Sequence, residues 1–365
     1  MKMHSMMTKK MKMMISKPNY RKAELAAHQL LQMNYVSELP VKVKKLIKPF
    51  PNLLIKKYSW FAKKRNMTHQ EVCNFTSSDE GALYYLKHPN GSTQYIILYN
   101  EKVKNKQRIR WTIAHELGHY MLKHNELTNK TLLGRSTLTE KEYQVFESEA
   151  NCFARELLAP QTVIAKLGKI NMFDIQNICE VSIEAASNVI KFLNKKIEKG
   201  YRFNFNKNIA ILFSEFINKT VNKHHCNICN RHFYYSNAKF CPFCRNENIY
   251  KTLITFGGKE DMKYDGYEVD DMGRAIECPQ CGNEEVLSAG EHCMICGIIL
   301  INKCATTYRA DDTGYYFNQE SCHAILQGNA RYCVHCGNES TFYQQDLLED
   351  WSRVQQQIEK SKIPF

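Results

Sequence analysis

The 365-residue sequence predicts an α+β domain followed by a helical extension and three small cysteine-rich modules. Its length indicates more than one folding unit, because about 150 residues form a typical domain. Two short runs of apolar residues precede long segments with helical periodicity, which is typical of an α+β domain. Twelve of the 15 cysteines follow residue 225, so the C-terminal part has a separate organisation.

Composition excludes several classes of protein. Hydrophobic residues make up 44% of the chain and charged residues 24%, which is close to globular averages and excludes a wholly disordered chain. No apolar run approaches the roughly 20 residues that span a bilayer, so we expect no membrane contact. Lysines scattered through the first 17 residues interrupt the apolar core that a signal peptide needs. These features favour a soluble, cytoplasmic protein.

The N-terminal half is predicted to begin with a flexible basic tail at residues 1–19. Helical spacing of alanines and leucines predicts a helix over residues 20–33, and a second helix is expected over residues 40–47. Segments 81–87 and 93–99 are predicted to be strands. They are joined across a His-Pro-Asn-Gly turn, which is a strong hairpin signal.

Two longer helices follow, over residues 106–123 and 140–158. We place the main domain at residues 20–160. The helical extension at residues 161–205 resembles a helix-turn-helix in outline. A plain helical pair that completes the core is the favoured interpretation, because the turn lacks a set of base-reading residues. The remaining units are predicted at residues 223–250, 272–300 and 301–343, with a C-terminal amphipathic helix at residues 344–365.

Positive charge is concentrated near the N-terminus. Residues 1–70 contain 16 lysines and arginines and two glutamates, a net charge of +14, whereas the whole chain has a net charge of +13. Basic clusters at residues 42–48 and 56–65 could form a face for nucleic acid or for an acidic partner. The favoured interpretation is that they are solvated faces of amphipathic helices.

Residues 111–120, WTIAHELGHY, contain a histidine pair that predicts a metal site. His115 and His119 are four residues apart, so their side chains point about 40° apart on one face of the predicted helix and reach one zinc ion. Glu116 lies beside them and is placed to accept a proton from a water without ligating the metal. The pattern therefore predicts a hydrolytic zinc centre.

The third zinc ligand is expected from the helix over residues 140–158. Glu147 and Glu149 point about 160° apart, so they cannot both face the metal. Glu147 is favoured, because it shares a stripe with small residues that allow close packing on the metal helix. Glu149 lies on a bulkier face. Asn151, one turn beyond Glu147, is expected to orient a ligating histidine through a hydrogen bond.

The run RIRWTIAHELGHYMLKH and the helical segment 147–160 resemble the ImmA/IrrE family of zinc metallopeptidases. The resemblance covers about residues 20–200 and implies a small zincin-like peptidase domain. It implies that the two histidines and Glu147 hold the zinc. It also implies hydrolysis of a peptide bond by a zinc-activated water, with Glu116 as the general base. Members of this family act on repressors, so the resemblance implies a regulatory protein as substrate.

The same resemblance matches the strand that ends at Tyr99 to the strand before the metal helix. It implies that this is an edge strand to which a substrate peptide adds, with Tyr99 and Asn100 as substrate-binding residues. Tyr120 and His124 are candidates for stabilising the developing oxyanion. His124 is predicted about 140° around the helix from His119, so a surface or packing role is favoured for it.

The C-terminal cysteines predict three structural zinc ions. Two sets share the spacing CxxC-x₁₁-CxxC, which suits a Cys₄ zinc ribbon, whereas the third has one CxxC pair and a looser pair that includes Cys322. The chain is thus predicted to hold four Zn²⁺ ions, one catalytic and three structural. The isolated Cys73, Cys152 and Cys179 are expected to be small buried side chains. The predicted ribbon ligands are Cys226, Cys229, Cys241, Cys244, Cys278, Cys281, Cys293, Cys296, Cys304, Cys322, Cys333 and Cys336.

The leading hypothesis is a cytoplasmic zinc endopeptidase with narrow substrate choice, in which the ribbons recruit a partner. Protein recognition by the ribbons is favoured over nucleic acid, because their half of the chain is nearly neutral. Nucleic acid stays open as a partner, through the ribbons or the basic N-terminal region. The alternative hypothesis is a non-proteolytic zinc-ribbon regulator that binds nucleic acid or protein and uses the HExxH domain as a scaffold. The intact Glu116 favours the enzyme, because this residue does not help to hold the metal.

Overall fold

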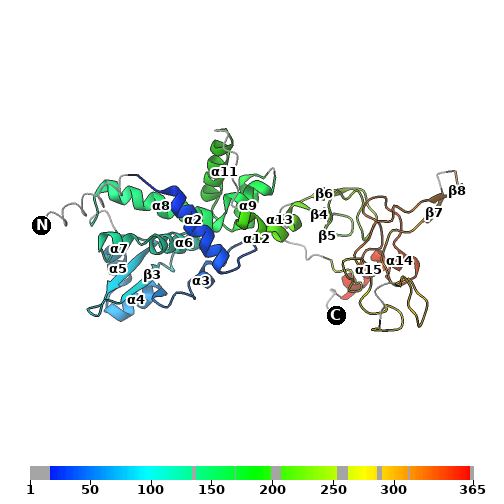
Figure 1. Cartoon of the computed structure of the whole chain (residues 1–365), viewed down its shortest axis with the longest axis horizontal. Coiled ribbons are helices and arrows are strands. Elements are labelled where there is room, and N and C mark those ends of the chain that lie inside the picture. The colour runs from blue at the N-terminus through cyan, green and yellow to red at the C-terminus, as the bar shows by residue number, and fades with distance from the viewer. Residues whose placement is uncertain are drawn as a thin grey trace. The chain divides into compact units, whose positions relative to one another are not determined.

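The chain forms two compact units, Met1–Asn218 and Lys219–Phe365, and Figure 1 labels most of their helices and strands. We call them the N-terminal and the C-terminal unit. Most of the predicted tail at residues 1–19 lies outside the described residues. The computed structural model describes residues 17–133, 137–168, 170–198, 207–252, 262–285, 290–310 and 313–361.

The N-terminal unit is built on a three-stranded sheet. Its strands are β1 (Leu53–Lys57), β2 (Gly81–Lys87) and β3 (Thr93–Tyr99), in the order β1-β3-β2. β2 and β3 form the predicted antiparallel hairpin, with Gly81 opposite Tyr99. β1 pairs in parallel with β3. No alternation of apolar and polar residues predicts β1, which has only five residues and ends in two lysines.

β3 is the central strand of this sheet, so the expectation that it is an edge strand is wrong. A hairpin alone leaves one edge of each of its strands open. Here β1, which is distant in sequence, covers the second edge of β3. A peptide therefore cannot add to β3, and the open edge of the hairpin belongs to β2.

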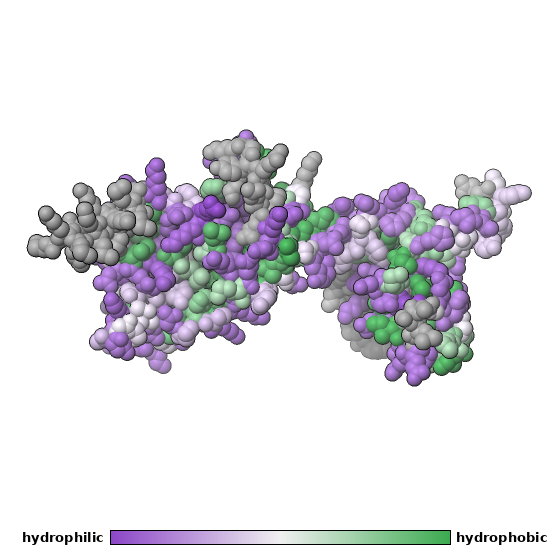
Figure 2. All heavy atoms as spheres, viewed as in Figure 1, coloured by the Kyte–Doolittle hydropathy of each residue, from purple (hydrophilic) through white to green (hydrophobic). Residues whose placement is uncertain are grey.

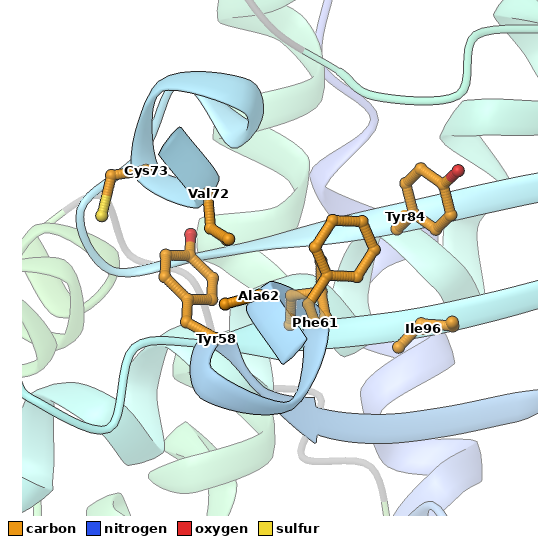
Figure 3. Close-up of a cluster of buried hydrophobic side chains, with 8 residues drawn as sticks. Tyr58, Phe61, Ala62, Val72, Cys73, Tyr84 and Ile96 are labelled. Carbon is orange, nitrogen blue, oxygen red and sulfur yellow. The ribbon is translucent and has the colours of Figure 1, made fainter. Parts of the chain in front are cut away.

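Helices α4 (Tyr58–Arg65) and α5 (His69–Thr76) cover one face of the sheet. Figure 3 shows their apolar side chains packed against β2 and β3. The rings of Phe61 and Tyr84 meet edge to face, 5.5 Å between centroids, an arrangement that aromatic pairs prefer. The buried cluster consists of Tyr58, Phe61, Ala62, Val72, Cys73, Tyr84, Ile96 and Leu98.

Helix α6 (Lys106–Leu122) covers the opposite face of the sheet. It begins after Asn105, whose side chain accepts hydrogen bonds from the backbone N–H groups of residues 107 and 108. Tyr120 of α6 contacts Tyr95 of β3, with 4.9 Å between ring centroids. Tyr95 and Ile96 are consecutive along the strand, so α6 and the α4–α5 pair contact opposite faces.

Helix α8 (Glu140–Leu158) packs closely on α6. It begins with a capping box formed by Thr139 and Glu142, which explains why the helix starts there. A Cβ atom added to Gly118 of α6 would lie 3.0 Å from Cδ1 of Phe153 on α8. Gly118 therefore lets the two helices approach, and this approach brings the acidic residues of α8 to the histidines of α6.

Among the described residues, seven further helices complete the N-terminal unit, and an eighth, α13, ends just beyond it. α2 and α8 are linked through the buried pair His28 and Glu156, whose Nε2 and Oε2 atoms are 3.5 Å apart. The helix expected over residues 40–47 is only the single turn α3. The predicted helical pair corresponds to α10 and α11, which are separated by a left-handed residue, Glu180. These elements are α2 (Tyr20–Met33), α3 (Val43–Leu46), α7 (His124–Thr128), α9 (Gln161–Lys166), α10 (Met172–Cys179), α11 (Ile183–Glu198), α12 (Lys207–Leu212) and α13 (Ser214–Val221).

The C-terminal unit is organised around its cysteines. In the first module β4 (Lys223–Cys226), β5 (Arg231–Tyr234) and β6 (Ile249–Lys251) form a small sheet in the order β5-β4-β6. Three of the module's four cysteines are buried in a cluster with Phe233 and Phe243. The cysteine cluster therefore takes the place of a larger apolar core in this small module.

The third module and the C-terminal helices follow. β7 (Thr307–Ala310) and β8 (Tyr316–Gln319) form an antiparallel hairpin inside the loop between Cys304 and Cys322. The C-terminal helical region is divided into α14 (Thr341–Gln344) and α15 (Trp351–Ser361). Trp351 packs against the cysteine cluster of the first module, so α15 belongs to the core of its unit.

Among the described residues, no helix is long and apolar enough to cross a membrane. On the face shown in Figure 2, hydrophobic residues form small groups between hydrophilic ones.

Candidate metal centre

Three predicted ligands converge where α6 meets α8. The Nε2 atoms of His115 and His119 are 3.1 Å apart, and each lies 3.4 Å from a carboxylate oxygen of Glu147. Zinc–ligand bonds of about 2.0–2.1 Å in a tetrahedron place neighbouring ligand atoms about 3.3 Å apart. The spacing and the donor set of two imidazoles and one carboxylate therefore fit a catalytic zinc ion, whose fourth position is left for water or substrate.

The three ligands line a cleft of about 820 Å³. Glu116 is buried in its wall and accepts a hydrogen bond from the backbone N–H of Leu83 on β2. Burial raises the pKa of Glu116 to about 7, whereas a nearby divalent cation acts in the opposite direction. Glu116 is not part of the group whose atoms could hold the metal. Its carboxylate is therefore available as a base beside the metal position.

Each histidine is oriented by a hydrogen bond through its other ring nitrogen. Nδ1 of His115 lies 3.0 Å from Oδ1 of Asn151, at the position predicted from helical spacing. Nδ1 of His119 lies 2.9 Å from Nδ1 of His124. His124 in turn contacts Glu149, with 2.9 Å between Nε2 and Oε2. Such partners fix the ring orientation and the tautomer of a metal-binding histidine.

The favoured interpretation of His124 as a surface or packing residue missed this contact. Its predicted angle from His119 assumes a continuous helix, but α6 ends at Leu122. Lys123 adopts a left-handed conformation with φ of 61°, which redirects the chain and brings His124 back to His119. His124 is fully buried. The predicted end of this helix at residue 123 is the sequence signal that could have indicated the arrangement.

Glu149 faces away from the metal position, in agreement with the preference for Glu147 as ligand. Its second carboxylate oxygen accepts a hydrogen bond of 2.6 Å from the backbone N–H of Asn19. Asn19 is the residue that caps α2. Glu149 thus connects the start of α2 to the imidazole pair behind the metal centre.

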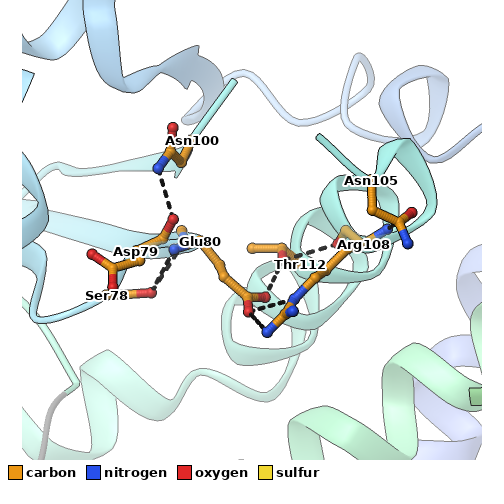
Figure 4. Close-up of polar contacts among 8 residues, drawn as sticks. Ser78, Asp79, Glu80, Asn100, Asn105, Arg108 and Thr112 are labelled. Carbon is orange, nitrogen blue, oxygen red and sulfur yellow. Dashed lines mark hydrogen bonds and ion pairs between the residues drawn. The ribbon is translucent and has the colours of Figure 1, made fainter. Parts of the chain in front are cut away.

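A polar network shown in Figure 4 holds the start of β2 against α6. Glu80 forms an ion pair with Arg108 and accepts a hydrogen bond of 3.2 Å from Thr112. A Cβ atom added to Gly81 would lie 2.6 Å from the side chain of Thr112 and 2.7 Å from the carbonyl oxygen of Leu98. Only glycine therefore permits this close approach, which sets the width of the cleft between β2 and α6.

Neither Tyr99 nor Asn100 lines the cleft, so substrate binding by these two residues stays a prediction. Asn100 donates a hydrogen bond of 2.7 Å to the carbonyl oxygen of Asp79, so it positions the cleft wall indirectly. Tyr99 is buried and accepts a hydrogen bond of 3.3 Å from Lys44. The part of the sheet that borders the cleft is Gly81–Leu83 of β2.

The two oxyanion candidates also lie away from the cleft. The hydroxyl of Tyr120 donates to Oδ1 of Asn52 at 2.8 Å, and His124 is buried behind His119. Tyr143, which sequence reasoning missed, does line the cleft. It precedes Glu147 by four residues on α8, so helical spacing places both residues on one face.

The twelve C-terminal cysteines form three separate groups of four. Opposite sulfur atoms are 3.5 Å apart in the first module, 3.5 and 3.6 Å in the second, and 3.4 Å in the third. A disulfide requires about 2.05 Å, whereas tetrahedral Zn–S bonds of about 2.3 Å separate the sulfurs by about 3.8 Å. The spacing in all three groups, including the one with Cys322, fits a bound zinc ion.

Comparison with known proteins identifies one region of similarity. Residues 68–191 match the family described as the IrrE N-terminal-like domain, a peptidase family. The match contains β2, β3, α6 and α8, and with them both histidines, Glu116 and Glu147. No curated protein matches the chain. The C-terminal unit lies outside the matched residues.

Proposed function

We propose that this protein is a zinc-dependent endopeptidase that cleaves a specific regulatory protein, because residues 68–191 match the IrrE N-terminal-like domain, a peptidase family. The observation that carries the proposal is the position of Glu116. Its buried carboxylate lies in the same cleft as the complete set of three zinc ligands but outside the ligand group. A scaffold that only holds zinc has no need of this residue.

His115, His119 and Glu147 would hold the metal ion, which supplies a more acidic water and polarises the peptide carbonyl. Glu116 accepts the proton from the attacking water and delivers it to the leaving amine. The backbone N–H of Leu83 holds this carboxylate in place. Tyr143 is the residue that we propose to donate a hydrogen bond to the developing oxyanion, because it lines the cleft on the same helix as Glu147.

We expect the substrate to bind as an extended segment along β2. Gly81–Leu83 borders the cleft, and the backbone groups of residues 81, 83 and 85 point away from β3. The N–H groups of these residues already donate to Ser78, Glu116 and Thr131, so this edge offers a substrate the carbonyl oxygens of Gly81 and Leu83. An added strand would therefore place its scissile bond beside Glu116. This arrangement favours an unfolded or loop segment of a protein as substrate.

Charge favours a protein over a nucleic acid as the partner of the ribbons. The C-terminal unit has 15 lysines and arginines and 19 aspartates and glutamates, a net charge of −4. Each Cys₄ site adds a further charge of −2, because four thiolates outweigh one Zn²⁺ ion, so the loaded unit carries about −10. Exposed Tyr308, Tyr316 and Phe317 on the β7–β8 hairpin offer apolar contacts to such a partner. We propose that this unit recruits the protein substrate in the cytoplasm, where thiols stay reduced.

The test compares the zinc-loaded full-length protein with its Glu116→Gln variant. Each is incubated with a soluble extract of the native host, and newly formed protein N-termini are identified by mass spectrometry. The variant should form them about 10²–10⁴ times more slowly, because a positioned base contributes that much. Glu198→Gln, an exposed change on α11, is the matched control and should behave like the wild type.

Zinc content should be the same in all three proteins. If the Gln variant produces the same new N-termini at the same rate, Glu116 is not the base and the proposal fails. If the wild type produces none but binds a host protein as tightly as the variant does, the non-proteolytic binding protein is the correct alternative.

A further inference from the structure

A second cavity, of about 380 Å³, lies against a different face of the metal helix. Ile109, Arg110 and Ile113 of α6 line this cavity, whereas Thr112 and His115 line the catalytic cleft. The peptidase proposal gives this cavity no role. It includes part of the basic cluster at residues 42–48, for which the described fold provides no amphipathic helix longer than the single turn α3.

Arg110 of α6 connects the walls of the cavity, because it forms hydrogen bonds to the segment before α3 and to the end of α10. Its guanidinium group donates to the carbonyl oxygen of Val41 at 2.8 and 3.3 Å. It also donates to the carbonyl oxygen of Glu180 at 2.7 Å and to that of Cys179. These contacts fix the segment before α3 and the end of α10 against α6. The cavity is therefore formed by connected elements and does not depend on one mobile loop.

The floor of the cavity is apolar and its rim is cationic. Val41, Val43, Tyr99 and Ile113 are buried in its walls. Four exposed lysines and one carboxylate surround the opening, so positive charge dominates. The first turn of α6 also contributes the positive end of a helix dipole. The charged lining residues are Lys42, Lys44, Lys45, Lys106, Arg110 and Glu180.

Lys44 places its ammonium group next to the apolar floor of the cavity. Its Nζ atom lies 3.3 Å from the hydroxyl oxygen of Tyr99 and 4.7 Å from the centroid of the same ring. This ammonium group can pair with an anion at the edge of the Tyr99 ring. A ligand with an aromatic or aliphatic body would pack on the apolar floor, while its single anionic group paired with Lys44.

We propose that this cavity binds a small amphipathic anion, such as an aromatic or medium-chain aliphatic carboxylate. A volume of about 380 Å³ falls within the range of roughly 300–1,000 Å³ that small-molecule sites occupy. The bound ligand would contact the helix that carries both zinc-binding histidines. The binding claim itself does not rest on the proposed peptidase activity.

The test uses the fluorescent anion 8-anilinonaphthalene-1-sulfonate with the full-length protein, and the uncharged N-phenyl-1-naphthylamine for comparison. Ile109→Trp, which fills the cavity, should remove one binding site. Replacing Lys44 and Lys45 together by glutamine should raise the Kd of the anion at least tenfold. Replacing Lys63 and Lys64 on α4 by glutamine is the control with the same change of net charge, and should leave the Kd unchanged.

Decanoate should displace the fluorescent anion from the wild-type cavity, and decanol should do so much less well. The variant with Lys44 and Lys45 replaced by glutamine leaves the apolar walls of the cavity unchanged. It therefore still tests the proposal if Ile109→Trp does not fold. If both lysine pairs weaken binding equally, the effect is one of net charge and the cavity is not the site. If the uncharged amine binds as tightly as the anion and is insensitive to Lys44 and Lys45, the proposed preference for an anion is wrong.

Discussion

His124 and Glu149 form a buried hydrogen bond of 2.9 Å behind the metal centre. When Nε2 of His119 ligates a metal, its Nδ1–H donates to Nδ1 of His124, and Nε2–H of His124 then donates to the carboxylate. The carboxylate–histidine pair that commonly supports a zinc ligand is thereby extended by one imidazole. Its far end is anchored by the backbone N–H of Asn19 at the start of α2.

We expect Glu149→Gln to weaken zinc binding at the catalytic centre without abolishing it. The amide keeps the shape of the side chain but loses the charge that supports the imidazole pair, and such partners are typically worth 10–100-fold in metal affinity. Competition with a chromophoric chelator measures the effect. An affinity equal to that of the wild type would show that the His124–Glu149 contact only supports packing.

Glu147→Ala should remove one zinc ion from the protein, because it deletes one of three ligands. Glu149→Ala should leave the number of zinc ions unchanged when zinc is in excess. Elemental analysis of the two purified variants, referenced to protein concentration, distinguishes them. The opposite pattern would assign the third ligand to Glu149 and overturn the geometry described for α8.

The wild-type chain should bind four zinc ions, and Cys322→Ser should bind three. Cys322 is exposed, but its sulfur lies 3.4 Å from that of Cys333, as close as the corresponding distances in the other modules. The matched control is Cys152→Ser, which changes a buried cysteine outside the three groups of four and should retain four ions. If the wild type binds only three zinc ions and Cys322→Ser also binds three, the third module is not a metal site.

The buried thiols of Cys73 and Cys179 should resist alkylation in the native protein. Burial raises the pKa of both, that of Cys179 to about 12. A raised pKa leaves less thiolate at any given pH, and the thiolate is the reactive form. Iodoacetamide at pH 7.5, followed by mass spectrometry, should modify these residues only after denaturation. Rapid modification of the native protein would show that the core around them opens readily.

The same shifts have a consequence for stability. In the unfolded chain a thiol ionises near pH 8.5, whereas in the folded state burial raises the pKa of Cys179 to about 12 and also raises the pKa of Cys73. Ionisation therefore favours the unfolded chain once the pH exceeds about 8.5, and the folded protein should become progressively less stable above it.

Local patterns in the sequence predicted the main elements around the site. Helical spacing indicated α2, α6 and α8, and the turn at residues 88–91 indicated the β2–β3 hairpin. The spacing of His115, Glu116 and His119 predicted their chemistry, since residues four apart share a helix face. These features depend on contacts between near neighbours, which the sequence encodes directly.

Pairings between distant segments were decided only by the tertiary structure. β1 joins β3 in parallel, so Tyr99 lies in a central strand and the cleft is bordered by β2 instead. The left-handed Lys123 ends α6 and returns His124 to His119. In both cases the outcome depends on the free energy of burying groups that are far apart in the chain or separated by a helix end. Periodicity carries no information about such burial.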